Sequence, residues 1–237
     1  MKKTLSLAKP ALAVAAAAAL SLSLVALAGC SGGTDAATNV ASSGSSSSSA
    51  AEASDADLMS GTHHAIIQVE GYDPITVELD ADAAPVTVTN FANLADDGYY
   101  NGLSFYRIVD DFCLQGGTTG NTASGNDPLL QPIKGEFSSN GVDNPLADKF
   151  DRGTVAMART SAPDSATSTF FVTLGDNDAV GTALDGKYAA FGTINEEGMA
   201  IIDAIVADYL ANVDDPQMGA ISDQAKQAKI VSIQMVD

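Results

Sequence analysis

Phe105-Tyr106-Arg107-Ile108-Val109 and, after two aspartates, Phe112-Cys113-Leu114-Gln115-Gly116-Gly117 carry more structural information than any other part of this chain. Both runs are rich in aromatic and β-branched residues, which predicts short strands at 103–109 and 112–115. An arginine in such a strand is more often a solvated or salt-bridged side chain than a functional one. The meaning of Arg107 therefore depends on the residues around it.

The sequence on either side of this stretch predicts further short strands and two helices. The strand-like segments lie at 63–70, 75–80, 154–158, 170–174, 189–194 and 230–236. Apolar residues at helical spacing predict a helix over 85–95, with Pro85 in its first turn and Gly98 after its end, and a second over 198–209. Many short strands and two separate helices predict a mainly β fold, a closed antiparallel barrel with helices packed over it.

The first thirty residues have the pattern of an export signal. Three lysines precede an apolar run at 11–28, which is typical of a signal peptide, although a membrane-spanning helix of this length is the alternative. Leu27-Ala28-Gly29-Cys30 resembles the lipobox of bacterial lipoproteins, in which cleavage precedes a cysteine that then carries lipid. We therefore expect residues 1–29 to be removed and Cys30 to be lipidated. Two or more acyl chains on this cysteine would make a stable membrane anchor.

Residues 30–60 are dominated by Ser, Ala, Gly, Thr and Asp. Such a segment has too little apolar bulk to offset the entropy of ordering it, so we expect a flexible tether with a span of roughly 30 Å. Residues 61–237 form the single expected domain. Cys113 has no partner for an intramolecular disulfide once Cys30 is lipidated, and its apolar surroundings predict a small buried side chain.

Charge and residue counts exclude several functions. The chain has 11 basic and 30 acidic residues, a net charge of -19, and such an acidic protein repels nucleic acid. His63 and His64 are adjacent on a predicted strand and so point to opposite faces, which makes a poor metal site. Asp176-Asn177-Asp178 lacks the later ligands of a calcium loop. We expect no metal and no cofactor.

Four blocks in order give the chain a specific resemblance. The Arg107 stretch is followed by Gly153-Thr154-Val155-Ala156-Met157-Ala158-Arg159, by Ser168-Thr169-Phe170-Phe171, and by Leu184-Asp185-Gly186-Lys187-Tyr188 with Phe191-Gly192. These blocks resemble the cyclophilin type of peptidyl-prolyl cis/trans isomerase. The resemblance implies a closed eight-stranded antiparallel β-barrel capped by two α-helices, with an open groove on its outer side and residues 118–149 as a long surface excursion.

The same resemblance implies roles for individual residues. Arg107 is the catalytic residue, and Gln115 hydrogen-bonds the substrate backbone and helps to orient Arg107. The remaining matched positions bind the substrate: Phe112, Cys113, Ala158, Arg159, Phe171, Leu184 and Tyr188. Taken singly, a Phe or Leu is more often ordinary core.

The chain also departs from the family pattern at four matched positions. Cys113 replaces the usual methionine, Thr169 a glutamine, and Tyr188 a histidine. Ala183 stands where animal relatives have a tryptophan that contacts cyclosporin, so we expect weak binding of that inhibitor.

These observations predict an enzyme of the peptidyl-prolyl isomerase class (EC 5.2.1.8) that assists the folding of exported proteins. Its partners are proline-containing exported polypeptides and the membrane that holds its lipid, and we expect a monomer on the extracytoplasmic face. The alternatives are a proline-binding chaperone module with little turnover, and a general lipoprotein for adhesion or solute capture.

Overall fold

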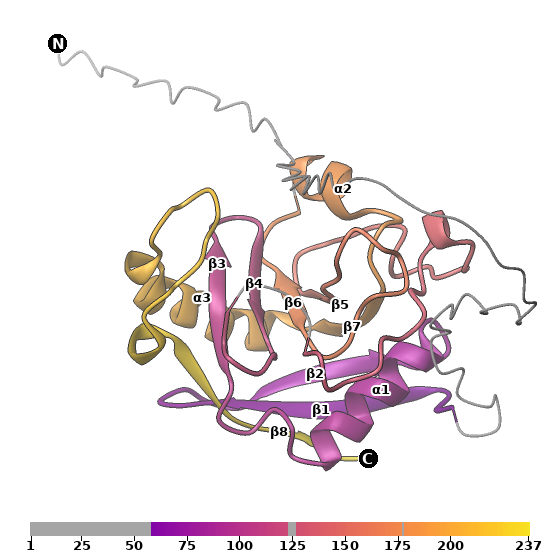
Figure 1. The fold of residues 1–237 in the computed structure, drawn as a ribbon, viewed down its shortest axis with the longest axis horizontal. Helices are drawn as coiled ribbons and strands as arrows, with labels where there is room; N and C mark the ends of the chain where they lie inside the picture. The colour runs from indigo at the N-terminus through magenta and orange to yellow at the C-terminus, as the bar shows by residue number, and fades with distance from the viewer. Residues whose placement is uncertain (1–57, 123–126, 177) are drawn as a thin grey trace, which may run out of the picture. The chain divides into compact units, whose positions relative to one another are not determined.

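A computed structural model of the chain describes residues 58–122, 127–176 and 178–237. Its eight strands are all antiparallel and close into one barrel in the order β1-β2-β7-β5-β6-β4-β3-β8, where β8 pairs back onto β1 (Figure 1). The strands are β1 Thr62–Val69, β2 Ile75–Asp80, β3 Ser104–Val109, β4 Cys113–Gly116, β5 Thr154–Met157, β6 Phe170–Thr173, β7 Ala190–Ile194 and β8 Ala228–Met235. The predicted barrel is confirmed, and each predicted strand end lies within two residues of the observed one.

The barrel has two apolar clusters because successive residues along its strands point to opposite faces of the barrel wall. On β2, Ile75, Val77 and Leu79 are fully buried while the residues between them are exposed. On β4 to β6 both faces are buried: Leu114 and Val172 belong to the barrel interior, whereas their neighbours Cys113 and Phe171 belong to a second cluster. Since successive strand residues point to opposite faces, this second cluster lies on the outer side of the barrel wall.

Helix α1, Pro85–Asp96, closes part of the barrel and is held by a distant carboxylate. Its N-cap residue Ala84 has no capping side chain, and the Glu136 carboxylate instead accepts hydrogen bonds from the backbone N–H groups of Val86 and Thr87, at 3.0 and 2.8 Å. A negative charge is stabilised at a helix N-terminus. Glu136 therefore fixes its own part of the long 118–149 segment against α1.

One side of α1 is buried. Phe91 is buried and packs against Tyr100 and Phe191, with ring centroids 5.3 and 5.1 Å apart. Val86 and Leu94, however, are only half-buried. The fully buried positions are Thr87, Val88, Phe91, Ala92 and Ala95. The hydrogen bonds of Thr87 to Glu136 explain how a threonine comes to occupy the inner face.

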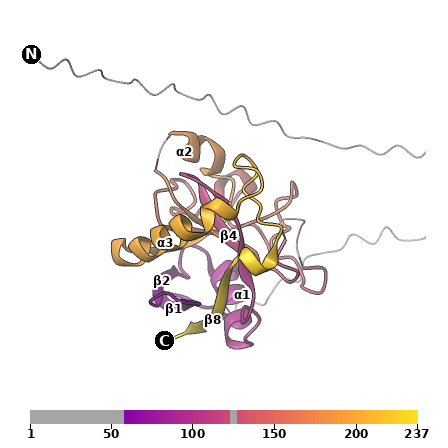
Figure 2. The same ribbon diagram turned by 90° about the vertical axis from the view of Figure 1, so that its left-hand side faces the viewer.

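Helix α3, Glu196–Tyr209, begins at Asn195, whose side chain accepts from the N–H of Gly198, and packs against β2. A third helix, α2, Asp178–Leu184, was not predicted. It lies at the end of the barrel away from α1 and β8 (Figures 1 and 2). Short 3₁₀ turns occupy Ser138–Asn140, Leu210–Asn212 and Gln224–Lys226.

The described part of the chain starts inside the predicted tether. Met59 packs against the core, and its N–H donates to Thr89 Oγ1 at 2.9 Å, so the folded domain includes residues 58–60. The predicted signal peptide, Cys30 and the rest of the tether lie outside the described residues. Among those that are described, none of the helices combines the length and the apolar character needed to span a bilayer.

Candidate active site

A β-bulge in β3 turns Arg107 to the outside of the barrel. Phe105 pairs with Gly116 and Arg107 with Gln115, so the register shifts by one residue between them and Tyr106 is the extra residue. Phe105 packs in the barrel interior, whereas Tyr106 and Arg107 both reach the side chain of Gln115. Bulges re-aim side chains in this way. Without the bulge, Arg107 would share the inward face with Phe105.

The guanidinium of Arg107 is held by three neutral acceptors. Its Nη1 donates to Gln115 Oε1 at 3.0 Å and to Cys113 Sγ at 3.1 Å, and its Nε donates to the Met218 carbonyl at 2.8 Å. Gln115 is itself oriented, because its Nε2 donates to the Tyr106 hydroxyl at 3.2 Å. Within the described residues no carboxylate forms an ion pair with Arg107. Its positive charge is therefore oriented but not neutralised.

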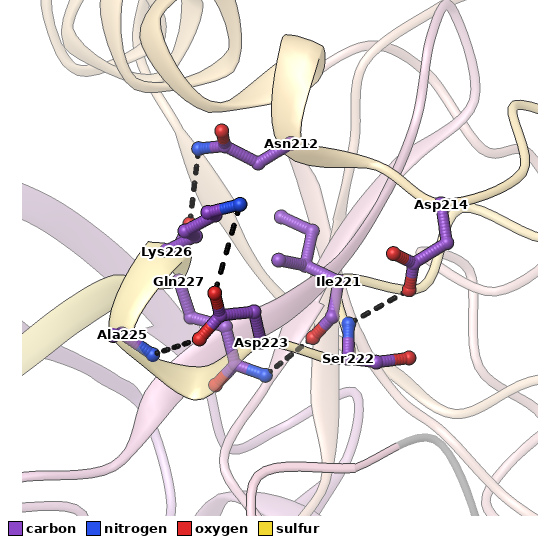
Figure 3. A network of polar contacts seen from close by, with 8 residues as sticks. All are labelled: Asn212, Asp214, Ile221, Ser222, Asp223, Ala225, Lys226 and Gln227. Atoms are coloured by element: carbon purple, nitrogen blue, oxygen red, sulfur yellow. Dashed lines mark hydrogen bonds and ion pairs between the residues drawn. The ribbon is translucent and has the colours of Figure 1, made fainter.

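The Met218 carbonyl comes from a loop that is hydrogen-bonded alongside β3. Ile108 N–H donates to the Gly219 carbonyl at 2.8 Å, and Ile221 N–H donates to the Tyr106 carbonyl at 2.9 Å. The loop is closed where the Asp214 carboxylate accepts from Ser222 N–H at 2.8 Å (Figure 3). Gln227 supports the same region by donating to the Ile221 carbonyl at 2.6 Å. We call residues 214–222 the arginine-supporting loop.

Beside Arg107 is an apolar pocket of about 180 Å³. Phe171 forms one of its walls, meeting the ring of Tyr188 edge-on at 5.7 Å and stacking on Phe150 at 6.3 Å. The volume is small against the roughly 300–1,000 Å³ of pockets for drug-sized ligands, and it suits a single ring. The lining residues are Arg107, Phe112, Cys113, Gln115, Ala158, Arg159, Phe171, Leu184 and Tyr188. The structure thus brings together all nine residues predicted for the site in the barrel domain; their individual roles stay predictions.

The register of the strands explains why residues far apart in sequence meet here. Arg107 pairs with Gln115, Gln115 with Phe171, and Phe171 with Ala156, so one row of side chains crosses β3, β4, β6 and β5. Ala158 continues this surface just past β5, where its N–H donates to the Thr169 carbonyl at 2.8 Å. Arg107, Gln115, Phe171 and Ala158 thus line the pocket from one face of the barrel wall.

Three contributors to the site were not predicted. Leu184 was named, but the helix α2 that positions it was not. Phe137 lies in the 118–149 segment and packs against the guanidinium of Arg159. Met218 contributes a backbone carbonyl, which no side-chain motif can reveal.

Burial controls the ionisation of the groups next to Arg107. Burial raises the pKa of the Cys113 thiol to about 11, although the nearby guanidinium acts in the opposite direction. Burial also raises the pKa of the Tyr106 hydroxyl. Both groups are therefore neutral at physiological pH and leave the charge of Arg107 intact. The described residues contain no cluster of His, Cys, Asp and Glu suited to a metal ion; His64 instead contacts Asp237 at 2.7 Å.

Comparisons with known proteins agree with this geometry. Residues 64–235 match the family model described as cyclophilin type peptidyl-prolyl cis-trans isomerase/CLD. The chain belongs to the cyclophilin family. A peptidyl-prolyl cis-trans isomerase of Acinetobacter baylyi is 39% identical over 163 residues, which are 68% of this chain and 79% of that protein. Peptidyl-prolyl cis-trans isomerase B of Escherichia coli is 36% identical over 154 residues, covering 61% and 80%.

The cyclophilin fold is also found among solved structures. A cyclophilin type peptidyl-prolyl cis-trans isomerase of Cryptosporidium parvum superposes with a TM-score of 0.59 at 22% identity, over 75% of this chain and 99% of that one. Family membership makes the chain a peptidyl-prolyl cis-trans isomerase, and it favours turnover over the alternative of a passive proline-binding module.

Proposed function

We propose that this cyclophilin accelerates rotation about X-Pro bonds in exported proteins, with Arg107 as its catalytic residue and a lipid on Cys30 as its anchor. The observation that supports a catalytic role for Arg107 is the way in which its guanidinium is held. The guanidinium is fixed by three neutral acceptors beside an apolar pocket, with no described carboxylate to neutralise it. An arginine that served only the fold would more often be ion-paired, as Arg152 is with Asp203.

The chemistry follows from the electronic structure of the amide. The barrier to rotation is roughly 18–20 kcal/mol because the nitrogen lone pair is delocalised into the carbonyl. In the twisted state the prolyl nitrogen becomes pyramidal and regains that lone pair, which can then accept a hydrogen bond. A guanidinium fixed beside it binds the twisted state more tightly than either planar isomer, and this difference lowers the barrier.

The other pocket residues hold the proline side of the bond in place while the other side rotates. Phe171 and Tyr188 offer aromatic surfaces to the compact apolar ring of proline, and this contact keeps the prolyl side of the bond fixed. Gln115 supplies an amide next to Arg107 for the substrate backbone while its Oε1 orients the guanidinium. No nucleophile, metal or proton transfer is required, because no covalent bond is broken.

The cellular location rests on the sequence before residue 58. The basic start, the apolar run at 11–28 and Leu27-Ala28-Gly29-Cys30 support export followed by lipidation at Cys30. A Ser-rich segment of about thirty residues would let the domain sample newly exported chains near the membrane, over roughly 30 Å. Unfolded exported chains populate both X-Pro isomers and exchange them over tens to hundreds of seconds, so an isomerase placed there would shorten their folding.

The catalytic proposal is tested by separating turnover from binding. We expect Arg107→Ala to lower kcat by two to three orders of magnitude, since one positioned donor contributes roughly 3–4 kcal/mol, with peptide affinity changed only a few-fold. Arg107→Lys should recover little of the lost turnover, because the lysine ammonium lacks the planar fork of N–H donors that a guanidinium has. Phe171→Ala should instead weaken ground-state binding. Exchange NMR on one proline peptide gives the rates, and titration gives the affinities. Near-native turnover in a folded Arg107→Ala protein would contradict the proposal.

The anchor is tested on the full chain in bacterial cells. We expect metabolic labelling with a fatty acid to mark the protein, and Cys30→Ala to abolish that label and to release the protein from the membrane fraction or leave it misprocessed. Cys113→Ala is the matched control, because it removes the other cysteine of the chain and should keep the label. An unmodified Cys30 in the mass spectrum of the mature protein would rule the anchor out.

A further inference from the structure

Arg159 is a second arginine that lines the pocket, and its surroundings differ from those of a structural arginine. Its guanidinium carbon lies 5.0 Å from the ring centre of Phe137 and 4.8 Å from that of Tyr188. Its Nε donates to the Lys187 carbonyl at 2.8 Å, and its Nη1 donates to the Thr160 carbonyl at 2.9 Å. All four of these partners are neutral groups.

The charge of Arg159 is therefore fixed in position without being compensated. Within the described ranges no carboxylate lies at ion-pair distance from Arg159, and its Nη2 has no hydrogen-bond acceptor. Arg152 shows the contrasting case in the same chain, because its Nη2 lies 2.7 Å from each carboxylate oxygen of Asp203. A chain with 30 acidic residues offers many possible counter-ions, yet none of the described ones reaches Arg159.

The two aromatic contacts also limit how a ligand can approach. Ring contacts occupy the π-system of the guanidinium and leave its N–H edge as the part able to bind a ligand. A guanidinium edge with free N–H donors matches the two oxygens of a carboxylate, and such charge-assisted pairs are the stronger hydrogen bonds in proteins. A fixed edge also loses little side-chain entropy on binding.

We propose that Arg159 is a specificity-determining residue that binds the side-chain carboxylate of an Asp or Glu close to the substrate proline. The inference rests on the proposed function, because it takes the pocket beside Arg107 as the site of the prolyl ring. The acidic residue would occupy the surface next to Tyr188, which borders both the pocket and Arg159. It would bind there even though the net charge of the chain, -19, repels acidic peptides at longer range.

A purely structural role for Arg159 makes a different prediction. Its hydrogen bonds to the carbonyls of Thr160 and Lys187 also connect two segments of the pocket rim. If that were its whole role, replacing Arg159 would affect acidic and neutral peptides equally. The decisive quantity is therefore the ratio of KM values for matched peptides, measured within each variant, and not the activity of any one variant.

The experiment uses pairs of proline peptides that differ only by Glu or Gln. The variable residue is placed in turn at each of the three positions on either side of the proline, and both termini are blocked so that no other carboxylate is present. We expect KM to be about fivefold lower for the Glu peptide at one or two positions, the size expected for a partly exposed charged pair. The advantage should shrink as salt is raised from low to physiological concentration.

Variants then assign the preference to Arg159. In Arg159→Gln we expect the KM of the Gln peptide divided by that of the Glu peptide to fall to one or below. Arg159→Lys should retain part of the preference for Glu. Lys229→Gln is the matched control: it removes the same charge from an exposed position on β8 outside the pocket, and it should keep the preference.

The inference would be overturned by equal KM values for Glu and Gln peptides at every position in the native protein, or by a Glu preference that survives in Arg159→Gln. The salt series on the native protein gives a readout even if a variant folds poorly, because a preference independent of salt would also contradict an ionic contact. A failure to isomerise the Gln peptides would count against the proposed function instead, so the two failures can be told apart.

Discussion

The thiol of Cys113 lies between Arg107, the proposed catalytic residue, and an apolar cluster. Its Sγ accepts a hydrogen bond from Arg107 Nη1 at 3.1 Å, while the side chain is only 1% exposed and packs with Phe171. The sequence predicted the burial, because the residue is in an apolar strand. It could not predict the contact with Arg107, which depends on the β-bulge that turns the arginine outward.

Burial of Cys113 should make the stability of the protein depend on alkaline pH. Burial raises the pKa of this thiol to about 11, against about 8.5 for an unhindered cysteine. The neutral thiol is thus favoured in the folded state, and its contribution is present in full below about pH 8.5 and is lost as pH rises towards 11. The full contribution of the neutral thiol to the free energy of unfolding is about 3 kcal/mol.

This prediction is checked by urea unfolding of the native protein and of Cys113→Ala between neutral and alkaline pH. The free energy of unfolding should fall more steeply in the native protein above about pH 8.5. Buried tyrosines such as Tyr100 also titrate in alkali, but they are present in both proteins, so the difference between the two curves isolates the thiol. Parallel curves would contradict the prediction.

At the scale of elements, motif-bearing strands were predictable and irregular segments were not. The strands β3, β4, β5 and β6 carry the family blocks, so their pocket residues could be named from sequence. Helix α2 has only seven residues, too few for a helical period to be recognised. Within the 118–149 segment, a composition rich in Gly, Asn, Asp and Pro gave no sign that Glu136 would cap α1 or that Phe137 would pack on Arg159.

The arginine-supporting loop is an element whose function lies in its backbone. Gly219 has φ +78°, and a Cβ built there would lie 2.5 Å from the Ile108 carbonyl oxygen. The loop approaches β3 this closely only because residue 219 is a glycine. The neighbouring Met218 carbonyl accepts from Arg107 Nε at 2.8 Å, so a displaced loop must also displace the guanidinium.

We therefore expect Gly219→Ala to lower kcat by about 10- to 100-fold with a smaller change in KM, because misplacing a catalytic group by about 1 Å is enough for such a loss. Gly61→Ala is the matched control. Gly61 has φ +80° but nothing within 4 Å of the added Cβ, so it carries the backbone strain alone, roughly 1–2 kcal/mol. Peptide isomerisation assays on both variants test this, and a native kcat in Gly219→Ala would show that the loop does not orient Arg107.

At the scale of the whole molecule, the barrel is closed by strands from opposite ends of the domain. β1 begins at Thr62 and β8 ends at Met235, and the two pair directly. The order of the remaining strands also mixes early and late segments, so that β2 lies beside β7. The pocket depends on this closure, because the strands that carry it form one side of the same ring. The resemblance predicted a closed barrel but not this order, which is a finding of the structure, since local patterns of hydrophobicity do not specify which strands are neighbours.

Ile230 is a central residue of this closure. It is fully buried in the barrel interior, its N–H donates to the Leu103 carbonyl at 2.8 Å, and its carbonyl accepts from Gly102 N–H at 2.9 Å. It also pairs with Val69 of β1. The neighbouring Val231 points the other way and is 47% exposed. Two adjacent aliphatic residues on one strand thus differ almost only in burial.

Ile230→Ala should therefore lower the free energy of unfolding by about 2–5 kcal/mol, through lost apolar contact and the cavity left behind. Val231→Ala should change it by less than about 0.5 kcal/mol. Because a closed barrel cannot lose one strand and keep its ring of hydrogen bonds, we expect the pocket to unfold together with the interior. Circular dichroism at increasing urea would report the barrel, and binding of a proline peptide would report the pocket. Coincident midpoints, both shifted in Ile230→Ala and unshifted in Val231→Ala, are the expected result; a pocket that still binds peptide after the barrel signal is lost would show that the outer cluster is stable without closure.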